Sequence, residues 1–149
     1  MVWAGISSNG TTDIAFLSSK MNSEDYQNVL EIYLLPVFHE ICGINGIFQQ
    51  DNAPIHTSTS TKNWLSANGI RTMKWPARSP DLNPIENIWG TLARKVYRNG
   101  RQFNSKSELQ QAITSEWASI DPEEIQKLIS SMKDRLIEVI TKKGAETSY

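Results

Sequence analysis

The sequence predicts an α/β fold, and two observations support this class. Short apolar segments rich in β-branched residues alternate along the chain with longer segments whose apolar residues recur every three or four positions. Strands and helices in alternation are typical of α/β domains. The 149 residues, of which 39% are hydrophobic and 21% charged, suffice for one core, so we predict a single domain over residues 1–149.

Two antiparallel strands open the predicted order of elements. Residues 1–6 and 13–17 are short, apolar and partly β-branched. The dipeptide Asn9-Gly10 between them is a strong signal for a hairpin turn, because both residues tolerate the left-handed backbone that such a turn needs. We therefore expect these two strands to pair with each other.

The next segment predicts a helix that runs to about Phe38. Asn22 or Ser23 can cap its first turn, and apolar side chains follow at helical spacing. Pro36 bends or ends this helix, because proline lacks a backbone N–H group.

The order continues as strand, helix, strand and three helices. Residues 47–50 and 70–75 predict strands, and residues 57–67 predict a helix between them. After the turn-rich segment "PARSPDLNP", residues 84–97 predict a further helix. The segments "SKSELQQAITSEWASI" and "DPEEIQKLISSMKDRLIEVITKKG" each start on a cap signal and continue as amphipathic helices, the second ending near Gly144.

The composition excludes several classes of protein. No run approaches the roughly 18 apolar residues of a membrane span, and no secretion signal opens the chain, so we expect no membrane association. The single Cys42 cannot form an internal disulfide, and His39 and His56 alone do not make a zinc cluster. We expect an intracellular protein without a small-molecule cofactor.

Positive charge is concentrated in the middle of the chain. Residues 62–106 contain nine Lys and Arg but only two Asp and Glu, whereas the net charge of the whole chain is −1. A basic segment of this kind can follow a phosphate backbone. It can equally form a solvated face, and the charges alone leave both interpretations open.

Asp51 follows the third predicted strand, at the carboxyl end where open α/β sheets place their ligands. A carboxylate beside a buried strand needs a partner, because burying an unpaired charge is costly. An Asx turn, in which Asp51 accepts a hydrogen bond from its own backbone, is the alternative interpretation.

Glu86 lies in the first turn of the helix predicted over residues 84–97. Asn83 at the N-cap, Pro84 at the first helical position and Glu86 at the third make a capping-box pattern, in which Glu86 serves the helix start and its dipole. A capping glutamate can also hold a metal ion, so the structural and the functional interpretations are compatible.

The segments "QDNAPIHTS" and "WPARSPDLNPIENIWG" together resemble the catalytic domain of the DDE transposases of the mariner superfamily, in its Tc branch. Thirty-four residues separate Asp51 from Glu86, which is this family's interval between its second Asp and its Glu. The resemblance covers nearly the whole chain, because "MVWAGISSNG" is similar to the family's second strand and "LNPIENIWGTLARKV" to its glutamate helix.

This resemblance implies a ribonuclease-H-like fold, a mixed sheet with flanking helices in the strand order 3-2-1-4-5. It also implies two Mg²⁺ or Mn²⁺ ions, held by carboxylates, for DNA strand cleavage and transfer. Asp51 and Glu86 match two of the three catalytic, metal-binding carboxylates of the family. The family's first Asp lies on the first, central strand, and the segment that starts at Met1 lacks it, so we expect a truncated, inactive site.

Asp13 is not expected to replace the missing carboxylate, because it starts a strand at the opposite end of the sheet from Asp51. Asn52, His56 and Asn87 match positions of the family motifs and are expected to support the two carboxylates through hydrogen bonds. For His56, the alternative is a plain polar contact near a helix start.

Four basic residues extend the glutamate helix, and they are Arg94, Lys95, Arg98 and Arg101. They are candidates for contact with DNA phosphates, which would position DNA without reading its sequence. Basic residues near the C-terminal end of a helix also complement its dipole, and the sequence does not decide between these roles.

The predicted function is therefore that of a partial DDE transposase domain, ancestrally an enzyme of DNA transposition and integration. DNA is the expected partner, a homo-oligomer is a further expectation, and the family implies location in the nucleus. The alternative is a non-catalytic remnant of a mobile element that binds nucleic acid or protein through its basic segment.

Overall fold

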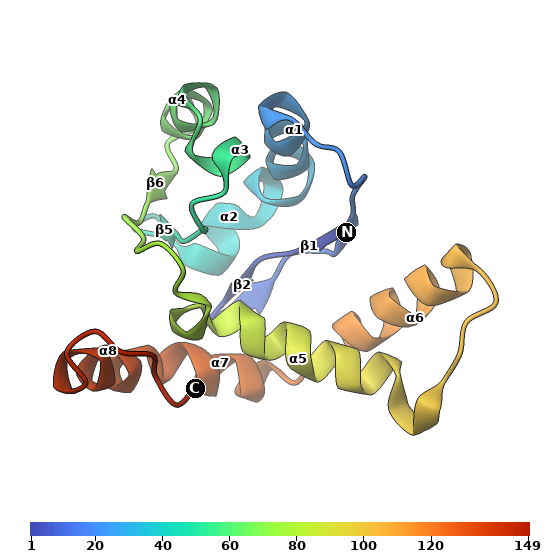
Figure 1. The fold of residues 1–149 in the computed structure, drawn as a ribbon. Helices are drawn as coiled ribbons and strands as arrows, with labels where there is room; N and C mark the ends of the chain where they lie inside the picture. The colour runs from blue at the N-terminus through green and yellow to red at the C-terminus, as the bar shows by residue number, and fades with distance from the viewer. The chain divides into compact units, whose positions relative to one another are not determined.

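The computed structural model describes residues 1–149 and shows the alternation of strands and helices that the sequence predicts (Figure 1). The chain forms two compact units. The first unit comprises Met1–Gly5 and Asn9–Arg78, and the second comprises Ile6–Ser8 and Ser79–Tyr149. The single domain predicted over residues 1–149 stays a prediction.

The predicted antiparallel pairing of the first strands is confirmed. Strand β1 (Val2–Trp3) pairs antiparallel with β4 (Ala15–Phe16). Between them, a turn joins β2 (Ile6–Ser7) to β3 (Gly10–Thr11), at the position of the Asn-Gly signal. Each of these strands has only two residues and is therefore shorter than the sequence predicts.

The two other predicted strands also pair with each other. Strand β5 (Ile47–Phe48) runs parallel to β6 (Arg71–Thr72). The paired strands form separate two-stranded sheets, so the single mixed sheet that the family resemblance implies is not formed by these residues.

The helix predicted to end near Phe38 divides into α1 (Ser23–Tyr33) and α2 (Leu35–Cys42). Asn22 caps α1 and forms a complete capping box, because its side chain accepts from the backbone of two first-turn residues and its own N–H donates to Asp25. The break falls before Pro36, in the first turn of α2, where its missing N–H group is tolerated. The helical path then continues beyond the predicted end.

A second predicted helix is also divided and starts earlier than expected. The short helix α3 (Pro54–Thr57) is followed by α4 (Thr59–Ala67). Ser58 separates α3 from α4, because its backbone angles are extended rather than helical. Its Oγ accepts a hydrogen bond from the Thr61 N–H at 3.1 Å and so caps α4.

The core of the first unit lies where α1, α2 and α4 pack together (Figure 1). Burial of each large apolar side chain stabilises the fold by about 1.5–3 kcal/mol. The fully buried members of this core come from the helical stripes and the start of the β6 segment, and they are Tyr26, Leu30, Leu34, Phe38, Leu65 and Ile70.

The second unit is mainly helical. The 3-10 turn η1 (Pro80–Leu82) leads into α5 (Pro84–Val96), as predicted for the glutamate helix, and η2 (Arg98–Gly100) follows it. Ile88, Leu92 and Val96, spaced by four residues, are buried along one face of α5.

Three further helices complete the second unit, namely α6 (Lys106–Ala118), α7 (Pro122–Ser130) and α8 (Met132–Thr141). The sequence predicts one helix where α7 and α8 lie, and the chain breaks it at Ser131. Gly144 follows α8 with a φ of 91°, which confirms the predicted stop signal. None of the helices has both the length and the apolar character needed to cross a membrane.

Candidate functional site

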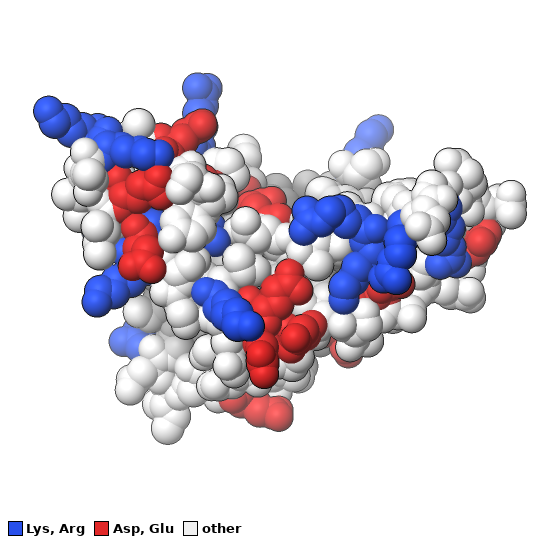
Figure 2. Space-filling model, turned by 90° about the horizontal axis from the view of Figure 1, so that it is seen from below, with Lys and Arg blue, Asp and Glu red and all other residues white.

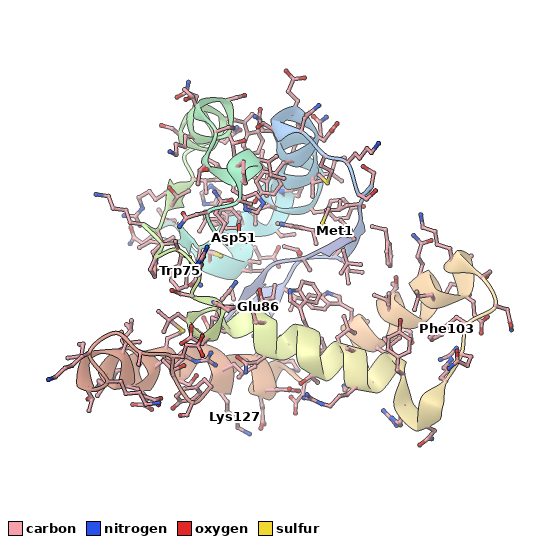
Figure 3. The ribbon with its side chains drawn as sticks, in the orientation of Figure 1. Met1, Asp51, Trp75, Glu86, Phe103 and Lys127 are labelled. Atoms are coloured by element: carbon pink, nitrogen blue, oxygen red, sulfur yellow. The ribbon has the colours of Figure 1, made fainter.

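Asp51 lies in the first unit, between the end of β5 and the start of α3 (Figure 3). Its Oδ1 accepts a hydrogen bond from the Ala53 N–H at 2.9 Å, which is the Asx turn that the sequence allows. The same Oδ1 lies 2.6 Å from Nδ1 of His56. Neither contact uses Oδ2, and the Asp51 side chain is 66% exposed. Asp51 thus forms the local turn and still presents a carboxylate oxygen.

Besides Asp51, residues of the core hold His56. Its ring packs on the ring of Tyr26, with centroids 4.2 Å apart. The Tyr26 hydroxyl donates to Oε1 of Gln50 at 2.7 Å, and Nε2 of Gln50 donates to the His56 carbonyl at 3.3 Å. Burial raises the pKa of Tyr26, so the phenol stays neutral and keeps its donor proton. The His56 ring is therefore fixed against Asp51.

Asn52 connects the Asp51 turn to the segment that follows β6. Its side-chain Nδ2 donates to the carbonyl of Trp75 at 2.9 Å. This bond joins residues that lie 23 positions apart in the chain, and both are in the first unit. The contact ties the turn to the segment after β6 and does not involve the Asp51 carboxylate.

Glu86 lies in the second unit, in the first turn of α5 (Figure 3). Its side chain is exposed, and its position near the helix N-terminus favours a negative charge. The capping box predicted for this turn is wrong at Asn83, whose side chain makes no cap hydrogen bond. The Asn83 N–H instead closes η1 by donating to the Pro80 carbonyl at 2.9 Å, because the 3-10 turn runs directly into α5.

Asn87 bonds Arg135, a residue that the sequence analysis does not single out. The Asn87 Oδ1 accepts from Nη2 of Arg135 at 3.0 Å. One sequence signal could have found this arginine, because Leu128, Met132, Arg135 and Val139 follow helical spacing and place a charge within an apolar stripe. Tyr26 and Gln50, which hold His56, were likewise not predicted as site residues.

The basic cluster at the end of α5 consists of Arg94, Lys95, Arg98 and Arg101. Arg94 donates to Thr91 Oγ1 at 3.0 Å, and Lys95 donates to the Ser119 carbonyl at 3.1 Å. The Arg101 guanidinium lies 4.8 Å from the centroid of the Phe103 ring. Figure 2 shows Lys and Arg side chains on both sides of this face, with one group of them on the side toward which α5 ends.

Asp51 and Glu86 have the chemistry that a hard divalent cation prefers. Both are carboxylates with exposed side chains, and Mg²⁺ and Mn²⁺ favour oxygen ligands. No group of three or more His, Cys, Asp or Glu residues that could hold a metal ion occurs in the structure. The two residues belong to different units, so their catalytic and metal-binding roles stay predictions, as do the supporting and DNA-binding roles of their neighbours.

The family model described as DDE superfamily endonuclease matches residues 1–110 of the chain. The chain is 45% identical over its full length to the transposable element Tc3 transposase of Caenorhabditis elegans, of which it covers 45%. It is 34% identical to the Tc1 transposase of the same species, of which it covers 54%. The chain thus spans about half the length of these curated relatives.

Solved structures of the Mos1 transposase share the fold. One is the Mos1 catalytic domain with Raltegravir and Mg, with a TM-score of 0.85, 20% identity, and coverage of 99% of this chain and 76% of that chain. Another is the Mos1 mariner paired-end complex with Mn, with a TM-score of 0.87 and 20% identity over 99% of this chain and 44% of that chain. The resemblance to transposases of the Tc branch is confirmed, and the chain belongs to the family of DDE superfamily endonucleases.

Proposed function

We propose that this chain provides two of the metal-binding carboxylates, Asp51 and Glu86, of a transposase that cleaves and transfers DNA strands. The observation that carries the proposal is their placement in a chain of this family, 34 residues apart, one after β5 and the other in the first turn of α5. Relatives that match the chain are transposases, and Mos1 structures with Mg and with Mn support the choice of metal.

When bound, the metal ions would activate a water molecule or a DNA 3′-hydroxyl and stabilise the leaving oxygen in an in-line attack on a phosphodiester. The residues of this chain would hold the carboxylates ready for them. Ala53 and His56 keep Oδ1 of Asp51 in place, which limits the rotation of the carboxylate and leaves Oδ2 outside these contacts. A pre-oriented ligand loses less conformational entropy when the ion binds.

The proposal includes a further strand that this sequence does not contain. In the family order, the first strand lies between strands two and four, which are β1 and β5 here, and these two are not paired with each other. That strand would carry the third carboxylate. The 149 residues alone would then hold metal weakly and cleave little or no DNA, and an unpaired strand edge would favour pairing with another chain.

Binding of Mn²⁺ tests the role of the two carboxylates without requiring activity. In ¹⁵N-labelled chain, we expect Mn²⁺ to broaden the amide signals nearest Asp51 and Glu86 by its paramagnetism. Asp51→Asn and Glu86→Gln should each weaken this effect, whereas Asp13→Asn, which removes an exposed carboxylate on the loop before β4, should not. Equal broadening in all four proteins would contradict the proposal.

A DNA cleavage assay tests the proposed inactivity. Supercoiled plasmid incubated with the purified chain and Mg²⁺ or Mn²⁺ should remain intact. Cleavage that is present in the wild type and absent in Asp51→Asn would show that the two carboxylates suffice, and would overturn the requirement for a third.

DNA contact is proposed for the basic cluster at the end of α5. Three members of the cluster are exposed, namely Arg94, Arg98 and Arg101. Lys95 is half-buried, and its Nζ donates a hydrogen bond to the Ser119 carbonyl. Phosphate contacts of this kind give affinity that falls with salt. Charge reversal of Arg94 and Arg98 should lower DNA affinity and flatten its salt dependence, and an unchanged affinity would exclude the cluster. Such binding without catalysis is the second candidate function.

Oligomerisation and location in the nucleus complete the proposal. Mos1 has been solved in paired-end complexes, one of them with a left transposon end, and these support the homo-oligomer and the DNA partner that we propose. Location in the nucleus would follow from a chromosomal DNA substrate, and fluorescence microscopy of the tagged chain would test it.

A further inference from the structure

Arg135 is a buried cation without an evident role in the proposed chemistry. It lies on α8, and its side chain has an exposed fraction of 0%. A buried guanidinium must have its donors satisfied, because its desolvation is costly. Its Nε donates to Ser131 Oγ at 3.0 Å, its Nη1 to the Asp81 carbonyl at 2.6 Å and its Nη2 to Asn87 Oδ1 at 3.0 Å.

Two of these acceptors lie on either side of Glu86. Asp81 belongs to η1, immediately before α5, and Asn87 follows Glu86 in the first turn of α5. The guanidinium therefore joins the turn that enters the helix to the helix itself. Because the guanidinium is a planar and rigid group, its two terminal nitrogens fix the spacing of the two segments that they bond.

The C-terminal segment closes the same arrangement. The ring of Tyr149 lies over the Arg135 guanidinium, 4.6 Å from ring centroid to carbon. The Thr147 N–H donates to Oδ2 of Asp81 at 2.8 Å. Asp81 is thus held twice, through its carbonyl by α8 and through its carboxylate by the C-terminal segment. All these residues belong to the second unit.

We propose that Arg135 is a positioning residue for Glu86, and that it acts by holding η1 and the first turn of α5 in one arrangement. The inference rests on the proposed role of Glu86 as a metal ligand. Residues that orient a ligand without touching the metal typically change metal affinity about 10–100-fold when they are lost. Arg135 lies 54 positions from Asp81 and 48 from Asn87 in the sequence, so these hydrogen bonds form only in the tertiary structure.

The test compares Arg135→Met, Arg135→Lys and Asn87→Ala with the wild type in the full 149-residue chain. Lys133→Met is the matched control, because it removes an exposed positive charge from the same helix. Two readouts are measured on each ¹⁵N-labelled protein. One is hydrogen exchange of the backbone amides of residues 85–88, and the other is the Mn²⁺ concentration at which the signals of those amides are broadened by half.

We expect faster exchange in the first turn of α5 and an increase of about tenfold in that Mn²⁺ concentration for Arg135→Met and Asn87→Ala. Arg135→Lys should not keep the wild-type values, because an ammonium group lacks the two terminal nitrogens of the planar guanidinium that bond Asp81 and Asn87. Lys133→Met should match the wild type. Adding Asn87→Ala to Arg135→Met should change little, since Arg135→Met already breaks the bond between Arg135 and Asn87.

Asn87→Ala keeps the test decisive if Arg135→Met does not fold, because it removes the acceptor and leaves the buried arginine its other partners. Unchanged exchange and Mn²⁺ response in Asn87→Ala would overturn the inference. If the wild type shows no Mn²⁺ effect near Glu86 but the variants exchange faster there, the proposed metal site fails while the hold of Arg135 on this turn stands.

Discussion

Removal of the Tyr26 hydroxyl is expected to destabilise the first unit by about 1–2 kcal/mol. In Tyr26→Phe the ring still fills its place, because Tyr26 is only 1% exposed and Phe has the same ring. The lost bond is the 2.7 Å contact to Gln50 Oε1, worth about 1 kcal/mol net, and the part-buried acceptor left behind adds to the loss.

The loss of unfolding free energy distinguishes the contribution of the Tyr26 hydroxyl from that of its ring. Tyr26→Ala should cost about 3–5 kcal/mol, because it removes a large buried side chain and the surface on which the His56 ring packs. Urea unfolding followed by far-UV circular dichroism measures both variants against the wild type. Gln50→Leu serves as the partner in a double-mutant cycle, and its effect should overlap with that of Tyr26→Phe.

Two results would refute this reasoning. A change below about 0.3 kcal/mol in Tyr26→Phe would show that the hydroxyl bond contributes nothing net. Full additivity of Tyr26→Phe and Gln50→Leu would show that the two groups do not act through one bond. Either result would also weaken the case that the core fixes His56 against Asp51.

Three further predictions concern pH and helix capping. Burial raises the pKa of Tyr26 in the folded state, so the stability contributed by its protonated phenol is complete below its ordinary pKa of about 10 and is lost as pH rises above that value. The free energy of unfolding of the wild type should therefore fall above about pH 10. In Tyr26→Phe, unfolding measured over the same pH range should show a smaller fall. The Thr147 backbone N–H, which donates to the Asp81 carboxylate, lowers the pKa of Asp81. The stability from this hydrogen bond is therefore present above about pH 4 and is lost as pH falls below that value. Unfolding of Asp81→Asn measured at acid pH should lack this loss. Asn22→Ala should lower stability by about 1 kcal/mol, because Oδ1 caps two backbone N–H groups of α1, and a thermal unfolding temperature equal to that of the wild type would contradict the capping role.

Features that depend on neighbouring residues could be predicted from the sequence alone. The turn between β2 and β3 lies at the Asn9-Gly10 signal, with Asn9 in the turn and Gly10 at the start of β3, because turn preference is a property of adjacent residues. The motifs around Asp51 and Glu86 likewise place the two carboxylates after a strand and at a helix start, and they were sufficient to indicate the family.

Features that depend on distant partners could not be predicted in this way. The Asn87 side-chain oxygen accepts from Arg135, 48 positions away. Helical spacing places Arg135 within an apolar stripe, but the sequence cannot show that its helix meets α5. The packing of Tyr26 on His56 and the division of the strands into separate sheets have the same origin. A turn or cap is decided by the backbone preferences of a few adjacent residues, whereas the contacts that hold Asp51 and Glu86 form only when folding brings distant segments together.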